Sequence, residues 1–383
     1  MSSNTLPGPV APHPVAIVLP HREAFGPTAA GAVAMVVRRL AAGPSRYKAL
    51  VVGPPFQGPG FPGIPFLPAR AVGWLPLTPT GRYAAGVARV LVPLRPGRAP
   101  GLIEVHNKPD VALWLAQLFP QARVSLFLHN DPRTMRGARS PRARQRLLHR
   151  VARVVTVSDF LRRALLDGVD QEPVRPPLVL HNALDPGEVP EGLPPAQRDK
   201  VILFAGRVVP DKGPDLFIAA CARALPHLPG WRAEMIGADG FQAGTPDSGY
   251  VRSLRPAAAE AGVAMLGARS HAEVLHAMAR AAIIVVPSRW AEPFGLTALE
   301  AMACGGALVC SGRGGLAEVA GEAALLADPE DTEAFAGALL RLAGDEGLRA
   351  ALSVAGMQRA RGCFSVADAV ARLDDLRDQA LAM

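Results

Sequence analysis

The stretch "AIIVVPSRWAEPFGLTALEAMACGGALVCS" (residues 282–311) decides the class of fold to expect. It begins and ends with short apolar runs that are typical of buried strands. Between them lie a Pro-Phe-Gly turn and a run of helix-forming residues that stops at Gly305 and Gly306. A strand, a helix and a second strand in this order build parallel sheets, so we expect an α/β protein.

The same alternation of apolar runs and helical patterns continues in both directions from this stretch. Residues 183–200, rich in Pro, Gly and charge, interrupt it and predict a linker. We expect two doubly wound, Rossmann-like domains over residues 1–185 and 186–364, followed by a helix over 365–383. Strands are predicted at residues 14–20, 47–53, 101–107, 123–130, 153–158 and 176–182, and again at 201–207, 231–237, 263–267, 282–288, 306–311 and 322–326.

Composition narrows the class of protein. The 383 residues suffice for two domains, and the chain contains no apolar run of 18 residues, so we expect no transmembrane helix. The N-terminus lacks the pattern of a signal peptide. Four cysteines form no CxxC pair, which favours reduced thiols in a cytoplasmic protein. Residues 1–190 carry 23 Lys and Arg against 10 Asp and Glu, and the rest carry 18 against 23. This asymmetry suggests that the first half faces an anionic partner.

Ligands bind beyond the carboxyl ends of the strands in such sheets, and we expect the two domains to face each other there across a cleft. The helix that starts near Gly295, Leu296 and Thr297 directs unpaired N–H groups to that edge, which suits a phosphate. Glu292 and Glu300 flank this helix start and could accept hydrogen bonds from hydroxyl groups. The alternative is a loop carboxylate and a helix carboxylate that are simply solvated.

A second group of candidates lies in "VILFAGRVVPDKGPDLFIAA" (residues 201–220). Here a strand ends at Gly206, and a helix begins near Pro214, a residue that suits the first helical position. Arg207 and Lys212 lie between them, and two cations beside a helix N-terminus suit a diphosphate. The alternative is a pair of solvated loop cations.

Together with "GRGGLAEV" (312–319), these segments resemble the family 4 retaining glycosyltransferases of the GT-B fold, whose E-x7-E motif is matched by Glu292 and Glu300. The resemblance is ordered from about Val201 to Leu326 and weaker in the first half. It implies a donor-binding C-terminal domain, an acceptor-binding N-terminal domain and a C-terminal helix that crosses back to the N-terminal domain.

The resemblance also implies a role for each matching residue. Arg207 and Lys212 would bind the donor diphosphate, Glu292 the donor sugar and Glu300 the ribose. The other residues expected at the donor are Gly206, Gly267, Arg269, Phe294, Gly295, Leu296 and Thr297.

Several residues of the N-terminal half match the family's pattern as well. In "LPHREAFGPTAAGAV" (19–33), Gly26 corresponds to a glycine that lies over the donor phosphates, although many relatives have two adjacent glycines there. In "LFLHNDP" (126–132), His129 is the candidate for contact with the donor sugar, and its alternative is a histidine packed at a strand end. His106 is a weaker candidate. Asn182 and Asp185 match a segment that we interpret as interdomain structure.

The sequence therefore predicts a metal-independent, retaining hexosyltransferase that uses a UDP- or GDP-sugar and acts on a glycan or lipid-linked acceptor in cell-surface polysaccharide or lipopolysaccharide synthesis. No cofactor is expected, because the nucleotide-sugar is a co-substrate. The absence of a D-x-D triplet argues against a metal-dependent GT-A enzyme, and "GPGFPG" (58–63) lacks the helix that a dinucleotide fingerprint requires. The alternatives are a GT-B phosphorylase, a nucleotide-sugar epimerase and a basic nucleic-acid-binding protein, although no nucleic acid is expected.

Finally, "SPRARQRLLHRVARVV" (140–155) predicts an amphipathic helix that begins after Ser140. Arg142, Arg146, Arg150 and Arg153 fall on one face at helical spacing. These arginines could face an anionic membrane, which would make the protein peripheral at the inner face of the plasma membrane. The alternative is a solvated helix face.

Overall fold

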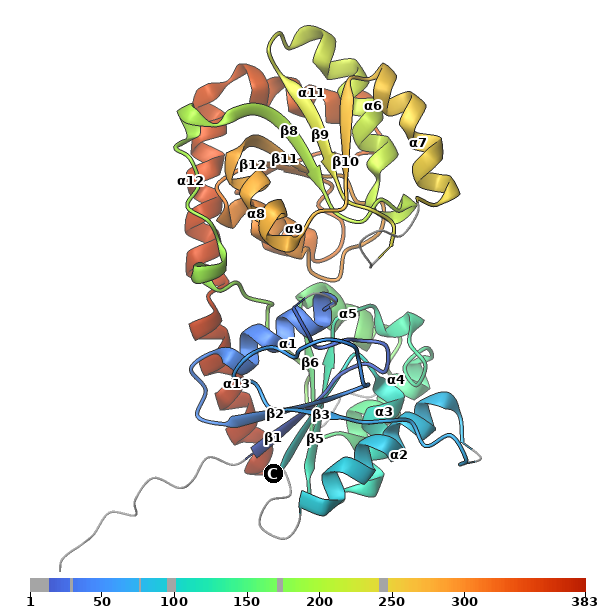
Figure 1. The fold of residues 1–383 in the computed structure, drawn as a ribbon. Coiled ribbons are helices and arrows are strands. Elements are labelled where there is room, and N and C mark those ends of the chain that lie inside the picture. The colour runs from blue at the N-terminus through green and yellow to red at the C-terminus, as the bar shows by residue number, and fades with distance from the viewer. Residues whose placement is uncertain (1–13, 28–29, 76, 95–100, 171–174, 241–246) are drawn as a thin grey trace, which may run out of the picture. The chain divides into compact units, whose positions relative to one another are not determined.

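The computed structural model of the chain describes residues 14–27, 30–75, 77–94, 101–170, 175–240 and 247–383 (Figure 1). Residues 1–13, on which the expectation of no signal peptide rests, lie outside this description. The chain divides into two compact units, and each is described by itself. Unit 1 comprises residues 1–156, 162–180 and 367–383, and unit 2 comprises residues 157–161 and 181–366.

The described residues of unit 1 form a sheet of seven parallel strands in the order β3-β2-β1-β4-β5-β6-β7. The strands are β1 (Pro14–Val18), β2 (Lys48–Gly53), β3 (Phe66–Pro68), β4 (Leu102–His106), β5 (Arg123–Leu128), β6 (Arg153–Thr156) and β7 (Leu178–Val179). Six of them were predicted. The sequence missed β3, an edge strand of three residues between prolines, because prolines are tolerated at a sheet edge but weaken the strand pattern.

Helices cover both faces of this sheet (Figure 1). Successive residues of β1 point to opposite faces: Val15 and Ile17 join an apolar cluster with α1 and α13, whereas Ala16 and Val18 join one with α2, α3 and α4. Burial on both faces explains why the strands read as continuous apolar runs. The helices are α1 (Ala32–Ala42), α2 (Pro79–Leu91), α3 (Pro109–Leu118), α4 (Pro141–Arg150), α5 (Asp159–Leu166) and α13 (Val366–Leu381). The first three residues of α5 and the first residue of α13 are counted with unit 2.

The prediction of one helix over residues 140–155 was wrong at its C-terminal end. Ser140 caps α4 as predicted, but the helix ends at Arg150. The β-branched run that follows instead forms β6, which begins at Arg153. Arg153 therefore leaves the predicted arginine face, and it contacts Gln379 of α13 at 3.3 Å. Arg144 is buried and donates hydrogen bonds to four backbone carbonyls.

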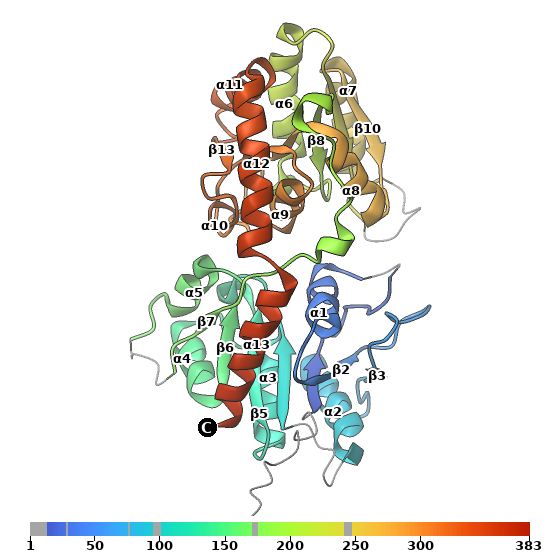
Figure 2. The same ribbon diagram turned by 90° about the vertical axis from the view of Figure 1, so that its left-hand side faces the viewer.

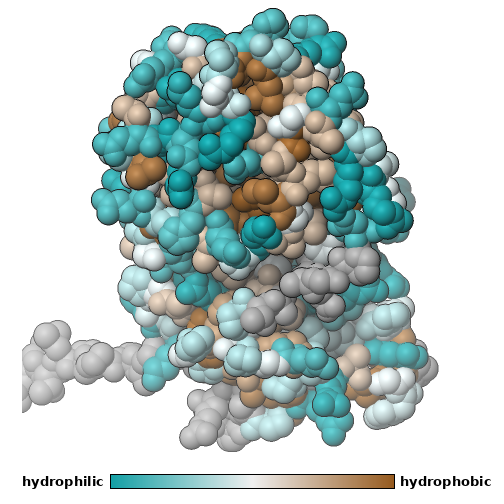
Figure 3. Space-filling model, turned by 45° about the horizontal axis from the view of Figure 1, so that its top comes forward, coloured by the Kyte–Doolittle hydropathy of each residue, from teal (hydrophilic) through white to brown (hydrophobic). Residues whose placement is uncertain are grey.

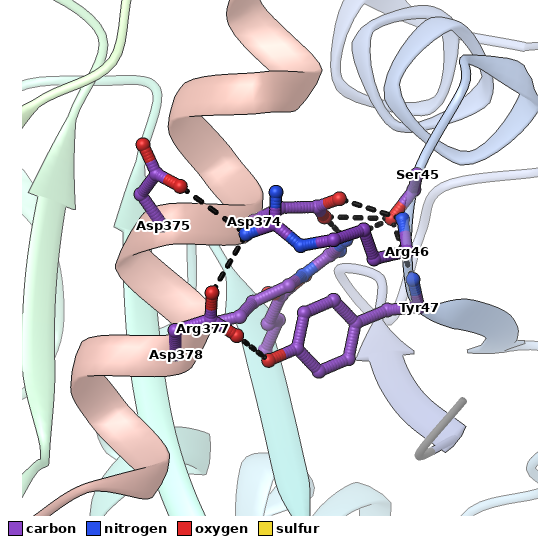
Figure 4. A network of polar contacts seen from close by, with 8 residues as sticks. Ser45, Arg46, Tyr47, Asp374, Asp375, Arg377 and Asp378 are labelled. Atoms are coloured by element: carbon purple, nitrogen blue, oxygen red, sulfur yellow. Dashed lines mark hydrogen bonds and ion pairs between the residues drawn. The ribbon is translucent and has the colours of Figure 1, made fainter. Parts of the chain in front are cut away.

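The C-terminal helix α13 belongs to unit 1, as expected, and lies along its sheet (Figure 2). Arg377 of α13 forms a buried ion pair with Glu104 of β4, with N–O distances of 2.7 and 2.9 Å. Asp374 accepts from Arg377 at 3.1 Å and from Ser45 at 2.7 Å. A second, exposed group of contacts links Arg46 and Tyr47 to the next turn of α13 (Figure 4). Polar contacts thus fix this helix to unit 1.

The described residues of unit 2 form a sheet of six parallel strands in the order β10-β9-β8-β11-β12-β13. All six were predicted from the sequence. They are β8 (Asp199–Ala205), β9 (Arg232–Ile236), β10 (Val263–Gly267), β11 (Ala281–Val286), β12 (Ala307–Cys310) and β13 (Ala324–Leu326). The helices are α6 (Pro214–Ala224), α7 (Gly249–Glu260), α8 (His271–Arg280), α9 (Leu296–Ala303), α10 (Leu316–Ala320), α11 (Thr332–Gly344) and α12 (Glu346–Cys363).

The apolar residues of unit 2 are also divided between two clusters. Leu203 and Ala205 of β8 pack toward α8, α9 and α10, and Ile202 and Phe204 pack toward α6, α7 and α11. On the face that Figure 3 shows, hydrophilic residues surround smaller groups of apolar ones. Among the described helices, none is both long enough and apolar enough to span a bilayer.

Candidate functional site

The candidate donor residues of unit 2 follow strands that lie side by side. Strands β8 and β11 pair in parallel, with Phe204 opposite Val285. The loops that follow them are therefore neighbours at the carboxyl edge of the sheet. Arg289 joins these loops: its guanidinium forms a two-point ion pair with Asp215 at 2.7 and 2.5 Å, and its backbone N–H donates to Asp211 at 2.9 Å. The sequence prediction overlooked both Arg289 and Asp215.

Lys212 and Glu292 meet at this edge. The Lys212 Nζ lies 2.6 Å from Glu292 Oε1, and the Ser288 hydroxyl donates to the same oxygen at 2.6 Å. The Glu292 side chain is 6% exposed and that of Lys212 is 22% exposed. The ammonium also lies 5.4 Å from the centre of the Trp290 ring. A buried carboxylate requires such partners, and an ammonium with three donors keeps others for a ligand.

The backbone of Glu292 is fixed by the loop after β12. Glu292 N–H donates to Arg313 at 3.2 Å, and Gly315 N–H donates to the Glu292 carbonyl at 2.7 Å. Gly314 has a φ of 70°, and a side chain there would bring its Cβ to 2.5 Å from the Glu292 carbonyl oxygen. The glycines of "GRGG" therefore permit a backbone contact that orients the carboxylate.

The predicted helix start is confirmed at α9. Gly295, with a φ of 108°, is its N-cap and makes no side-chain capping hydrogen bond. The first amide groups of an α-helix, here those of Leu296 and Thr297, have no partner within the helix. The Phe294 side chain, in contrast, is buried among other aromatic rings, 5.9 Å from His181 and 5.7 Å from Phe364 by ring centres. Only its backbone remains a candidate for ligand contact.

Glu300 lies in the second turn of α9, away from the Lys212 contact. Its carboxylate is 2.9 Å from the Nε2 of His271, the first residue of α8, and its side chain is 12% exposed. His271 was not among the predicted residues. The sequence could have indicated His271, because it follows β10 closely, two residues after the candidate Arg269. Parallel strands end at the same edge of a sheet, so residues that follow them lie near one another.

The remaining unit 2 candidates lie on the loops that follow β8 and β10. Gly206 and Gly267 both have positive φ values, 157° and 71°. Arg207 and Arg269 are exposed, and the Arg269 guanidinium donates to the carbonyl of Ala268 at 3.0 Å. The close partner of Lys212 is Glu292, and Arg207 lies five residues before Lys212 on the same loop. A joint contact of Lys212 and Arg207 with a diphosphate stays a prediction.

In unit 1, His129 pairs with the second candidate histidine. The His106 Nδ1 and His129 Nε2 atoms are 2.9 Å apart, and the rings stack with centres 5.1 Å apart. Burial lowers the pKa of His129 to about 4, and burial, then the neighbouring His129, lowers that of His106 well below its usual value. Both rings are therefore neutral at pH 7, and one of them donates the shared proton to the other.

Gly26 is buried against another segment of its own unit. A Cβ at this position would lie 2.5 Å from the Pro59 carbonyl oxygen, so the close approach of the two loops requires glycine. Nearby, Glu23 accepts a hydrogen bond at 3.0 Å from the Ala34 N–H in the first turn of α1. Burial raises the pKa of Glu23. Internal contacts account for both residues, and a phosphate contact of Gly26 stays a prediction.

The second half of the chain is similar to known proteins. Residues 188–359 match the family model described as "Glycosyl transferases group 1". A D-inositol 3-phosphate glycosyltransferase of Acidothermus cellulolyticus is 38% identical over 162 residues, which cover 40% of this chain and 35% of the relative. An exopolysaccharide phosphotransferase of Streptomyces coelicolor is 38% identical over 169 residues, covering 43% of this chain and 17% of the relative. The chain thus matches well under half the length of these curated relatives.

Solved structures resemble the whole chain. The Anabaena protein HepE, solved with UDP and glucose, superimposes with a TM-score of 0.74 at 20% identity. The match covers 96% of this chain and 99% of that protein. Both parallel-sheet units therefore have the architecture of the GT-B fold, and residues 188–359 match the model of the glycosyl transferases group 1 family.

Proposed function

We propose that the protein transfers a hexose-type sugar from a UDP- or GDP-sugar to a hydroxyl group of a glycan or lipid-linked acceptor. The observation that carries this proposal is the cluster of Lys212, Glu292 and Ser288 beside the N-terminus of α9. It combines a cation, helix amides and a buried carboxylate at one sheet edge, which suits a ligand that carries both phosphates and hydroxyl groups. The HepE complex, which contains UDP and glucose, supports this choice of ligand.

Each group would then have a separate task. Lys212 and Arg207 would bind the diphosphate and stabilise the negative charge that develops as the nucleotide departs. The amides of Phe294, Gly295, Leu296 and Thr297 would add hydrogen bonds to the phosphates and the sugar. Glu292, which Lys212 and Ser288 hold in one orientation, would accept from hydroxyl groups of the donor sugar.

Glu300 would bind the ribose diol, and Gly206, Gly267 and Arg269 would border the nucleoside. In unit 1, Gly26 would lie near the phosphates and His129 would contact the sugar. At neutral pH His129 would act as a hydrogen-bonding group and not as a cation, because burial holds its pKa at about 4.

We further propose that transfer retains the anomeric configuration and needs no metal ion. Lysine, arginine and helix amides supply the positive charge that a metal would provide, and the Glu292 carboxylate is occupied by Lys212 and Ser288, which disfavours it as a free nucleophile. The acceptor hydroxyl would approach the face from which the nucleotide leaves, and a phosphate oxygen would take its proton. Activity should therefore persist in excess EDTA, and a loss that Mn²⁺ or Mg²⁺ restores would contradict this part of the proposal.

The acceptor side of the proposal rests on charge. The first 190 residues carry 23 basic and 10 acidic side chains. This net positive charge suits peripheral binding to an anionic membrane, and we place the protein at the cytoplasmic side of that membrane. The names of the two curated relatives, one for an inositol phosphate and one for an exopolysaccharide, fit a role in cell-surface polysaccharide or lipopolysaccharide synthesis.

The test has two stages. Wild-type protein is first screened for thermal stabilisation by UDP- and GDP-sugars, because a donor that binds the native state raises the melting temperature. Release of free UDP or GDP is then measured with a panel of glycan and lipid-linked acceptors. Lys212→Ala is compared with Lys200→Ala, a substitution of an exposed lysine in β8.

A glycosyltransferase releases nucleotide in proportion to acceptor, and Lys212→Ala abolishes most of this release while Lys200→Ala does not. Conversion of the donor without acceptor would identify an epimerase. Formation of a sugar 1-phosphate from glycan and inorganic phosphate would identify a phosphorylase. Either result would refute the proposed transfer.

A further inference from the structure

A cavity of about 600 Å³ opens between α3 and α4 of unit 1, and it shares no residue with the candidate donor site. This volume is in the range of pockets that hold small ligands. Its walls come from α3, from α4 and from the loop before α4. The lining residues are Asp110, Leu113, Trp114, Ala116, Gln117, Arg136, Gly137, Arg146 and Arg150.

The charged residues of this cavity have one dominant sign. Three guanidinium groups, those of Arg136, Arg146 and Arg150, line it together with a single carboxylate, that of Asp110. Arg136 approaches Asp110 at 3.9 Å, but within the described part of the chain no carboxylate pairs with Arg146 or Arg150. The cavity therefore has an excess of about two positive charges.

The two α4 arginines are unfavourable for the helix itself. They lie four residues apart, so they are neighbours on one face, and like charges at this spacing destabilise a helix slightly. The helix sequence PRARQRLLHR contains no acidic residue to compensate. Arg150 gains from its position in the last turn, but Arg146 does not. A bound anion would offset this repulsion.

The α3 wall carries apolar side chains between Asp110 and Gln117. Val111, Ala112 and Leu115 of α3 are buried in the core, which directs Trp114 to the cavity. The Trp114 side chain remains 36% exposed, and Leu118 in the next turn is 44% exposed. An indole ring beside guanidinium groups provides a flat surface for a sugar ring or a similar apolar face.

We infer that this cavity binds a phosphomonoester attached to a sugar-sized ring. A phosphomonoester carries a charge of about −1.5 to −2 at pH 7, which matches the excess charge of the cavity, and arginine forks bind its oxygens in pairs. The attached ring lies on Trp114. The phosphomonoester is either that of a free sugar phosphate or that of a lipid headgroup, because both present the same chemistry. This site does not depend on the transferase activity.

Calorimetry with glucose 6-phosphate, glucose and inorganic phosphate tests whether the cavity binds a free sugar phosphate. Glucose 6-phosphate should bind saturably, inorganic phosphate more weakly and glucose not at all. Arg146→Gln and Arg150→Gln should each weaken binding about tenfold or more, as for lost charge-assisted hydrogen bonds. Trp114→Ala should weaken glucose 6-phosphate more than inorganic phosphate. Arg142→Gln is the matched control, since Arg142 is exposed on the same helix but does not line the cavity.

Sedimentation with vesicles tests whether the cavity binds the phosphomonoester of a lipid headgroup. Vesicles of phosphatidylcholine with phosphatidylinositol 4-phosphate, whose headgroup is a ring that carries a phosphomonoester, are compared with phosphatidylglycerol vesicles of equal surface charge. A preference for phosphatidylinositol 4-phosphate that is lost in Arg146→Gln but kept in Arg142→Gln assigns the site to a headgroup. Lys212→Ala in unit 2 should leave binding unchanged in both assays. Equal effects of Arg142→Gln and Arg146→Gln, or no saturable binding to any probe, would overturn the inference.

Discussion

Two buried ion pairs of this protein have similar chemistry but different surroundings. Arg377 and Glu104 of unit 1 are each 3% exposed, and the remaining donors of Arg377 contact Asp374 and Ser45. Lys212 and Glu292 of unit 2 are 22% and 6% exposed, and the ammonium contacts the Glu292 carboxylate at 2.6 Å. In the first pair, which we call the closed pair, the donors of Arg377 contact other residues of the protein. In the second, which we call the open pair, the Lys212 ammonium has donors left for a ligand at a sheet edge. This difference separates a pair that holds the fold from one that suits a ligand.

The largest effect should follow from opening the closed pair. Arg377→Ala leaves Glu104 buried without its partner, so the free energy of unfolding of unit 1 should fall by about 3–5 kcal/mol. Urea denaturation followed by circular dichroism measures this change. Arg372→Ala, at an exposed position of α13, is the control and should change stability little. A loss as small as that of the control would mean that the network of Figure 4 does not hold α13 in place.

Removing the cation of the open pair should affect turnover. Lys212→Ala should lower kcat about 10²–10³-fold, as expected when one preorganised donor to the developing charge is lost. The loss of stability should be smaller than that of Arg377→Ala, because Ser288 still donates to Glu292 and the site is closer to solvent. Steady-state kinetics beside Lys200→Ala provide the comparison. Normal turnover together with a large loss of stability would reverse the assignment of the two pairs.

The buried histidines His106 and His129, which lie near the closed pair, predict that the free energy of unfolding falls in acid. Burial lowers the pKa of His129 to about 4, so the unfolded chain, whose histidines titrate near 6.5, binds more protons below pH 6.5. The stability that neutral His129 contributes should therefore be complete above about pH 6.5 and fall by about 1.4 kcal/mol per pH unit toward pH 4. His106, whose pKa is also lowered, should make the total fall steeper. Urea midpoints from pH 7.5 to 4.5 measure this slope. The slope of stability against pH should be shallower in His129→Gln than in the control His149→Gln, because His149 is exposed on α4. An identical slope in both variants would contradict the prediction.

The smallest effect is expected at Glu300, which lies outside the Lys212 contact. A ribose contact binds the ground state and the transition state alike, so Glu300→Gln should raise the donor KM about tenfold with little change in kcat. Glu292→Gln should lower kcat instead, because the sugar loses its position at the reacting carbon. Glu346→Gln, at an exposed position of α12, serves as the control. The opposite pattern would show that the roles of the two glutamates are exchanged.

The sequence determined the architecture and much of the candidate site. Apolar runs of strand length predicted twelve strands that the structure contains, because strands buried on both faces need apolar residues throughout. The turn before α9 was equally legible, since Gly295 must adopt a positive φ there. Glu292, Glu300 and Lys212 were chosen as candidates by type and spacing, because each follows a strand that ends at the carboxyl edge of the sheet.

Tertiary structure alone decided which partners these residues have. Nothing in the local sequence pairs Arg377 with Glu104, 273 residues away, or His106 with His129, because such contacts depend on how helices and strands pack. The same holds for Ser288 and His271, which hold the two glutamates, and for the arginines of α4, of which one is buried against carbonyls and two line a cavity. A periodic pattern specifies the face of an element, but the geometry between elements specifies what that face meets.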